Sequence, residues 1–412
     1  MNVVDTMVIG AGHAGLAVSR CLTDRGIEHV VLERGRLAER WRSARWDSFR
    51  LLTPNWLTRL PGRVYDGPDP DGFMGSAELV GQLEAYAAGF AAPVLDRTPV
   101  TDVRPEADGY QVRTDTGGWR ASNVVIATGY HSRALVPPFA AALPADIAQV
   151  TPAGYRSPER LPAGAVLVVG ASASGVQIAD ELARAGREVI VAVGAHTRLP
   201  RRYRGRDMFW WLDRTGSLDR TRAEVPDART DREPSLQLTG DDRAVDLAAL
   251  RDRGVRLAGR FVDLHGGVAR FADDLTDTVA AADIRMRRVL STIDRYAGGL
   301  SGVPNEDPPR PVTVPRGPSR LDLGRAGIGA VVWATGSRPS YPWLAVPVLD
   351  TAGRLRHRRG VTEAPGLYAV GLRFQHRRRS TLIDGAGEDA AFLVDHIVTQ
   401  RQATTGRQTV GC

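Results

Sequence analysis

Three glycines near the start of the chain have the spacing of a turn that binds a dinucleotide. Gly10, Gly12 and Gly15 form the pattern G-x-G-x-x-G. In such a turn the first glycine permits a tight bend, the second lets the backbone approach a diphosphate, and the third allows helix and strand to pack closely. Glu33 stands 23 positions after Gly10, near the ~20 at which an acid bonds ribose hydroxyls. This stretch therefore predicts a site for an adenine dinucleotide with an unphosphorylated ribose.

A second glycine-rich turn, at 170–175, differs from the first at two places. Ser172 replaces the middle glycine, and Gly194 stands where an acid would follow the second strand. An acid at that position repels a 2′-phosphate, whereas arginines bind one. We therefore expect the second turn to bind NADPH, with its 2′-phosphate near Arg198 or Arg201. The alternative is that these arginines are ordinary surface residues.

Both turns lie between an apolar strand and a helix whose apolar residues recur at helical spacing. We expect a strand, a helix and a strand at 5–10, 14–25 and 28–33, and again at 165–169, 176–185 and 188–193. Two more apolar strands, 123–129 and 328–336, both end in Ala-Thr-Gly. Further helices are expected at 76–90, 245–253, 275–296 and 388–400. The pattern predicts an α/β protein with two Rossmann-like dinucleotide-binding domains.

The bulk composition is that of a globular protein with two or three domains. The chain has 412 residues, of which 43% are hydrophobic and 25% charged. It contains no apolar run of about 18 residues and no leader pattern, so we expect no membrane span and a cytoplasmic location. All 54 basic residues are arginine, which excludes a Schiff-base or P-loop lysine. No nucleic-acid-binding motif accompanies the net charge of +7.

Only two cysteines occur, Cys21 and Cys412. They form neither a C-x-x-C nor a C-x4-C pair, which excludes a dithiol redox centre and a structural zinc site. We expect no metal, and a reducing compartment.

The segment 41–56 is dense in aromatic side chains. Trp41, Trp46, Phe49 and Trp56 fall within it. Such a segment either covers a core or forms a wall around a planar cofactor, and we favour the wall. A second apolar segment, 203–216, is expected to be core or substrate wall, and the charged stretch 219–233 a surface loop or a flap.

Six segments, taken in order, resemble the flavin-containing monooxygenase family, above all the branch with the plant auxin-forming flavin monooxygenases and their bacterial relatives. The segments are G-A-G-H-A-G-L-A at 10–17, W-D-S-F-R-L-L-T-P at 46–54, I-A-T-G-Y at 126–130, G-A-S-A-S-G at 170–175, W-A-T-G-S-R-P at 333–339 and G-L-Y-A-V-G at 366–371.

This resemblance implies FAD on the first turn and NADPH on the second, with the NADPH domain (161–319) inserted into the FAD domain (1–160 and 320–412). The FAD residues would be Gly10, Gly12, Gly15, Glu33, Arg34, Trp41, Arg42, Leu52, Thr53, Val100, Gly371 and Leu382. The NADPH residues would be Gly170, Ser172, Ser174, Gly175, His196, Arg198 and Arg201. Thr128, Gly129, Thr335 and Gly336 would lie beside the cofactors.

The activity that the resemblance implies is NADPH-dependent monooxygenation. Reduced flavin would add O2 to give a C4a-hydroperoxide, which oxygenates nitrogen, sulfur or an activated carbon of a small molecule. The cofactor carries this chemistry, so no nucleophile–base pair is required. His131, His376 and Asp384 are weak candidates for proton handling. A homodimer is compatible with this interpretation.

Two other interpretations stay open: an NADPH oxidase or electron-transfer flavoprotein that serves a partner protein, and a nucleotide-sensing module without turnover. The family signature F-x-G-x-x-x-H-x-x-x-Y/F is incomplete here, and this incompleteness favours the oxidase or electron-transfer interpretation. Counted back from Tyr155, its Phe, Gly and His positions are Ala145, Ile147 and Thr151.

Overall fold

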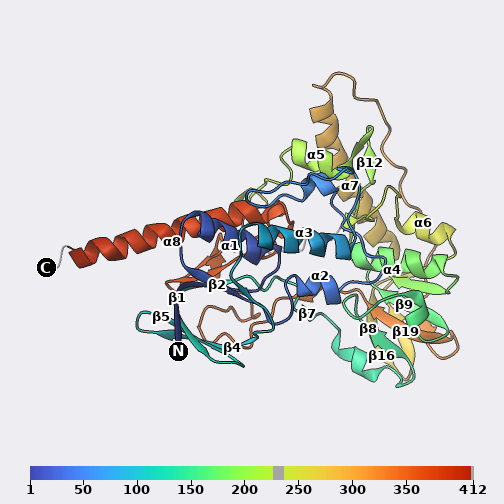
Figure 1. Ribbon diagram of the computed structural model, residues 1–412. Helices are drawn as coiled ribbons and strands as arrows, with labels where there is room; N and C mark the ends of the chain where they lie inside the picture. Colours follow the sequence, from blue (N-terminus) through green and yellow to red (C-terminus); the bar gives the residue numbers. More distant parts are fainter. Residues whose placement is uncertain (226–235, 410–412) are drawn as a thin grey trace.

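The computed structural model describes residues 1–225 and 236–409. Two parallel β-sheets form its two main units, which lie at opposite sides of the molecule in Figure 1. The predicted α/β class is confirmed.

The first sheet is built around the opening strand. Its parallel strands run in the order β23 (Leu367–Ala369), β6 (Gly118–Ile126), β1 (Asn2–Ile9), β2 (His29–Leu32) and β3 (Val94–Leu95). An antiparallel meander of β4 (Val100–Glu106) and β5 (Gly109–Thr114) adds to β6, and β21 (His357–Arg358) and β22 (Val361–Thr362) add to β23.

The second sheet repeats this order. Its parallel strands are β8 (Ala148–Val150), β19 (Ile328–Trp333), β9 (Ala165–Val169), β10 (Val189–Ala192) and β15 (Arg256–Ala258). In both sheets the strand before the glycine-rich turn therefore lies beside a strand that ends in Ala-Thr-Gly. Because the β-strand period is two, Val166 and Val168 face one core and Leu167 the other.

Helices cover both sheets. In the first unit α1 (His13–Asp24) packs beside α8 (Ala386–Thr409), which extends far out of the body in Figure 1. In the second unit α4 (Ala173–Arg184) packs beside α6 (Leu247–Asp252). The remaining helices are α2 (Glu39–Ser43), α3 (Ser76–Gly89), α5 (Met208–Arg214) and α7 (Leu275–Ala297).

The chain crosses between the two units at a short ladder. β7 (Arg133–Ala134) follows the first Ala-Thr-Gly and pairs antiparallel with β20 (Ser337–Arg338), which follows the second. β8 and β19, which the sequence assigned to the first unit, belong to the second sheet. The domain boundaries at 160 and 320, which were placed at proline-rich connectors, stay a prediction, although these two strands pair within the second sheet.

Small elements complete the insertion. Three antiparallel strands form a separate sheet: β16 (Phe261–His265), β17 (Val268–Phe271) and β18 (Arg320–Asp322). Two-residue pairs are β11 (Thr197–Arg198) with β14 (Leu236–Gln237), and β12 (Arg202–Tyr203) with β13 (Arg206–Asp207). Short 3-10 turns lie at Asn55–Leu57, Pro138–Ala142, Pro158–Arg160, Arg222–Glu224 and Arg378–Thr381. The apolar segment 203–216 contributes Trp211 and Phe209 to a core with α7. Part of the stretch 219–233, and Cys412, lie outside the described residues.

Candidate dinucleotide and active site

The first glycine-rich turn has the backbone geometry that its sequence predicts. Gly10 takes φ +111°, and a Cβ built there would lie 2.7 Å from the carbonyl oxygen of Ala127. A Cβ at Gly15 would overlap the carbonyl oxygen of Gly10. The Ala-Thr-Gly strand end thus lies directly against the turn. Gly371, also predicted here, reaches the same place, since its built Cβ would lie 2.9 Å from the Cβ of Ala14.

The first turn leaves the groups that a diphosphate needs open to a ligand. A Cβ at Gly12 would meet nothing within 4 Å, and no side chain caps the N-terminus of α1. The buried Glu33 accepts hydrogen bonds from the backbone N–H of Ala11 (2.8 Å) and of Gly35 (3.0 Å). A carboxylate has about four acceptor sites, so Glu33 can also accept ribose hydroxyls. The Thr128 hydroxyl oxygen is buried without a partner. These residues fit an adenine dinucleotide.

The second turn has the same construction. Gly170 takes φ +114°, and its built Cβ would crowd Ala334 of the second Ala-Thr-Gly. A Cβ at Gly175 would overlap the carbonyl oxygen of Gly170. Ser172 precedes α4 with no side-chain cap, so the first N–H groups of that helix can receive an anion.

The structure gives the predicted 2′-phosphate arginines other partners. Arg198 is buried and pairs with Asp246 (2.8 Å) and Asp283 (2.7 Å). Arg201, with 1% of its surface exposed, pairs with Asp207 and donates to the carbonyl oxygen of Leu52 (2.8 Å). Because both charges are compensated by carboxylates, these contacts do not support the predicted phosphate contact.

The neighbouring His196 is equally enclosed. It is 1% exposed, and its Nδ1 lies 2.9 Å from the carbonyl oxygen of Gly194. Burial lowers its pKa. An uncharged, enclosed imidazole does not supply the positive charge that a 2′-phosphate would need.

A cluster of aromatic and basic side chains lies where loops of the two units meet. Trp41 packs against His13 (ring centroids 6.1 Å apart) and Phe49 (6.2 Å). Tyr130 and His131 follow the first Ala-Thr-Gly, with ring centroids 3.9 Å apart. His131 Nδ1 bonds the hydroxyl of Ser337, which follows the second Ala-Thr-Gly. We call this set, with Arg40 and Arg45, the junction cluster.

Protein surroundings make His131 a weak base although part of it is solvent-accessible. Burial first, and then the charges of Arg45, Arg40 and Arg373, lower its pKa to about 3. The pKa of His13 falls to about 4 through burial and the charge of Arg45. Both imidazoles are therefore neutral at neutral pH.

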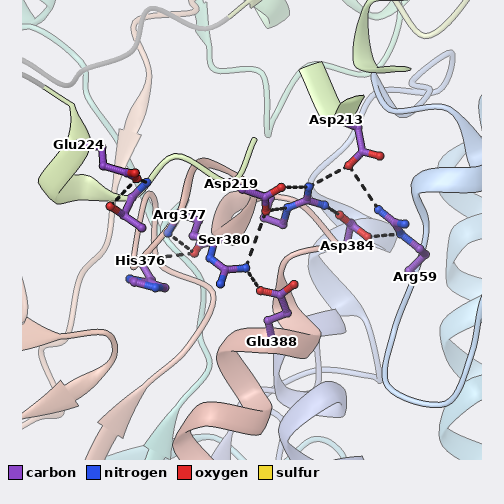
Figure 2. Close-up of polar contacts among 11 residues, drawn as sticks. Arg59, Asp213, Asp219, Glu224, His376, Arg377, Ser380, Asp384 and Glu388 are labelled. Carbon is purple, nitrogen blue, oxygen red and sulfur yellow. Dashed lines mark hydrogen bonds and ion pairs between the residues drawn. The ribbon is translucent and has the colours of Figure 1, made fainter. Parts of the chain in front are cut away.

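A second charged cluster holds the turn before α8 (Figure 2). Arg379 pairs with Asp213, Asp219 and Asp384, and Arg59 also pairs with Asp384. The predicted proton-handling residue Asp384 is therefore buried and compensated by two guanidiniums. The His376 N–H donates to the Ser380 hydroxyl, and its carbonyl oxygen accepts from Arg222 N–H. Because Asp213 and Asp219 belong to the insertion, these contacts bind the turn before α8 to the insertion.

The other predicted residues lie as follows. Arg42 pairs with Glu84 of α3, and Leu382 packs against the core that contains Trp211. Val100 begins β4, half-buried, and Arg34 is exposed. The Thr335 hydroxyl donates to the carbonyl oxygen of Leu135. Gly129 and Gly336 end the two Ala-Thr-Gly segments, Ser174 lies in the first turn of α4, and Thr53 is half-buried.

Sequence reasoning missed Arg45 and Arg379. Two partners of Arg379, Asp219 and Asp213, are 160 and 166 residues earlier, so no local pattern could identify them. Arg45 stands in the aromatic segment, where its interleaving with Trp41 and Phe49 was an available signal.

None of the helices in the described part of the chain is long and apolar enough to cross a bilayer. Within residues 1–225 and 236–409, no group of three or more His, Cys, Asp or Glu side chains is arranged to hold a metal ion.

Comparison with known proteins agrees with this geometry. Residues 7–206 match the family described as pyridine nucleotide-disulphide oxidoreductase. The chain is 32% identical over 403 residues to a CzcO-like oxidoreductase of Geobacillus kaustophilus, covering 96% of this chain and 99% of that protein. It is 30% identical over 208 residues to the probable indole-3-pyruvate monooxygenase YUCCA4 of Arabidopsis thaliana, about half of each chain (49% and 50%).

Among solved structures, a flavin-containing monooxygenase from Stenotrophomonas maltophilia has the same fold. Its TM-score is 0.68 at 19% identity, covering 97% of this chain and 99% of that one. The resemblance predicted from the motifs is confirmed, because half of the chain is similar to a plant flavin monooxygenase relative and the fold is that of a flavin-containing monooxygenase. The chain belongs to the family of the CzcO-like oxidoreductases.

Proposed function

We propose that this protein is an FAD-dependent, NADPH-using monooxygenase that oxygenates nitrogen, sulfur or an activated carbon of a small molecule. The observation that carries the proposal is the pair of matched dinucleotide turns. The Ala-Thr-Gly strand beside each turn is followed by a loop, and these two loops meet at His131 and Ser337. Only the first turn is followed by a buried acid, Glu33. Two different dinucleotides, one on each turn, fit this asymmetry.

FAD would be held by the N–H groups of α1, by Gly12 and by Glu33, with Thr128 beside it. When bound, it supplies the redox and oxygen chemistry that no amino acid side chain provides. The chain's own residues would orient it and exclude water: Trp41 and Phe49 form an apolar wall, and Arg379 fixes the turn that contains Asp384.

NADPH would lie on the N-terminus of α4. We retain it as the donor because Gly194, rather than an acid, follows β10, so no acid at that position repels a 2′-phosphate. Arg198 and Arg201 are not part of the proposal, since each is paired with a carboxylate.

The experiment is turnover of FAD-loaded protein with NADPH, with oxygen uptake and peroxide release measured together. The panel contains amines, thioethers and keto acids, among them indole-3-pyruvate, the substrate in the names of the plant relatives. We expect at least one panel member to raise oxygen uptake while peroxide falls and an oxygenated product forms. Prompt peroxide release with every panel member would contradict monooxygenation.

A second candidate is an NADPH oxidase or a reductase that serves a partner protein. One observation favours it: where relatives' signature has histidine, Thr151 instead accepts N–H bonds from Gly154 (2.9 Å) and Tyr155 (2.8 Å) within a turn. This candidate predicts NADPH consumption that no small substrate changes, and reduction of an added protein or dye acceptor.

A further inference from the structure

Arg45 differs in its partners from three buried arginines of the described chain. Arg198, Arg201 and Arg379 each pair with at least one carboxylate. No described carboxylate lies within ion-pair distance of Arg45. Its Nη1 donates to the carbonyl oxygen of Ala44 (2.9 Å), and its Nε is buried without any partner. Burial, and the charge of Arg40, lower its pKa to about 10. A desolvated cation without a counter-charge is costly unless something else compensates it.

Aromatic rings hold this guanidinium in place. Its central carbon lies 4.6 Å from the ring centroid of Trp41 and 5.1 Å from that of Phe49. Cation–π contacts stabilise a guanidinium and leave its edge free for hydrogen bonds. The stacking therefore fixes the orientation of Arg45 without using its donors.

The surroundings of Arg45 are positive or neutral. Arg40 donates to the carbonyl oxygen of His131, and burial lowers the Arg40 pKa as well. The ring of His131 is neutral and bonds Ser337, while His13 packs on Trp41. Loops of both units thus meet around two guanidiniums, and neither of these guanidiniums forms an ion pair with a described carboxylate. The charge of Glu33 raises the pKa of Arg40, but the hydrogen bonds that Glu33 accepts come from backbone N–H groups.

We propose that Arg45, with Arg40 beside it, binds an anionic oxygen group of a ligand at the junction of the two units. Two ligands could present this chemistry there: the diphosphate of the nicotinamide dinucleotide, or the carboxylate of an organic acid substrate. A guanidinium fork suits both, because its N–H groups match paired anionic oxygens. The inference deepens the proposed function and rests on it for the identity of these two sources.

The test compares Arg45→Met and Arg45→Lys with the unaltered protein. Arg20→Met is the matched control, because Arg20 also lies over an aromatic ring (Phe90, 5.6 Å) but pairs with Asp24 (2.9 Å). Calorimetric titration with inorganic pyrophosphate and with pyruvate measures anion binding directly. Anaerobic flavin reduction at increasing NADPH and NADH gives the dissociation constant of the donor.

If Arg45 binds the diphosphate, Arg45→Met weakens pyrophosphate and both donors by about tenfold or more, the effect of one lost charge-assisted bond, and Arg45→Lys restores part of it. If Arg45 binds a carboxylate, the same variants lose pyruvate binding while the donors are unaffected. Pyrophosphate, pyruvate and both donors all binding as in the unaltered protein would overturn the inference.

The two proposals fail in different ways. A protein that takes up no FAD contradicts the proposed function, whereas the pyrophosphate titration still decides whether Arg45 binds anions. Circular dichroism of each variant shows whether it folds. Arg45→Gln, which keeps a polar side chain of similar length, replaces Arg45→Met if that variant does not fold.

Discussion

Gly12 and Gly15 have different roles in the first turn: Gly15 is required for packing, and Gly12 leaves the backbone open to a ligand. A side chain at Gly15 would overlap Gly10, so this position is required by the fold itself. A side chain at Gly12 would meet only open space, so this position is free of any packing demand. Gly12 also precedes the uncapped N-terminus of α1, and at that position a glycine lets a diphosphate approach the backbone.

We therefore predict that Gly12→Ala folds normally but loses FAD. At this extended N-cap position, exchanging glycine for alanine costs at most about 1 kcal/mol, while the added methyl occupies the approach of the diphosphate. FAD content after reconstitution and urea unfolding are the measurements. Gly81→Ala on α3, where a Cβ also meets nothing, is the control and should retain FAD. Equal FAD content in both variants would show that the diphosphate does not bind at Gly12.

Asp389 predicts a pH dependence of stability. This buried carboxyl, in the first turn of α8, has an Oδ2 without a partner, and burial raises its pKa to about 6. At pH values between its unfolded and folded pKa, Asp389 is protonated in the folded state and ionised in the unfolded state. Its contribution to the free energy of unfolding therefore falls as the pH rises to about 6. Asp389→Asn should therefore stabilise the protein at about pH 8, by up to about 3 kcal/mol, and less at about pH 5.

The free energy of unfolding in urea at both pH values checks this expectation. Asp395→Asn is the control, since Asp395 is exposed on the same helix. An equal gain for Asp389→Asn at both pH values, or no gain at either, would show that its ionisation does not oppose folding.

At the scale of elements, one arginine joins three segments that are distant in the chain. Arg379 follows β23, Asp213 lies in the last turn of α5, and Arg59 follows the Asn55–Leu57 turn. Both arginines pair with Asp384 and with Asp213 (Figure 2). Backbone bonds run alongside, from Arg379 N–H to Leu218 (2.9 Å) and from Arg222 N–H to His376 (3.1 Å). The insertion and the turn before α8 are therefore held as one body.

Arg379→Met should destabilise the protein strongly, because three carboxylates lose their shared cation. The expected cost is about 3–5 kcal/mol, as for other buried pairs that lose one partner, measured as the free energy of unfolding in urea. Arg356→Met, which removes an exposed pair with Glu363, should change little. A similarly small change for Arg379→Met would mean that the cluster does not hold the segments together.

The elements that the sequence predicted well are those with strong local patterns. The helix expected at 76–90 is α3 (Ser76–Gly89), and that expected at 275–296 is α7 (Leu275–Ala297). The helix expected from Glu388 begins at Ala386 and ends at Thr409. The strand β8 was not predicted, because three residues carry no periodicity and only pairing with β19 defines it.

The site divides in the same way. The glycine turns were predicted because their spacing is local. The carboxylate partners of Arg198 were not predicted, because Asp246 and Asp283 lie 48 and 85 residues beyond it. A cluster of arginines in sequence predicted a phosphate, whereas in space each arginine is neutralised by a carboxylate from another element.

At the scale of the whole molecule, two units with the same strand order meet at β7 and β20, where the chain crosses in both directions. The two dinucleotide turns are thus built alike, and only their acids and side chains distinguish them. The central claim is that FAD occupies the first turn and a nicotinamide donor the second.

Anaerobic titration of FAD-reconstituted protein with NADPH tests this claim most directly. We predict one FAD per chain and loss of the oxidised flavin absorbance on addition of an equivalent of NADPH. A folded protein that binds no FAD, or a bound flavin that neither NADPH nor NADH reduces, would contradict it.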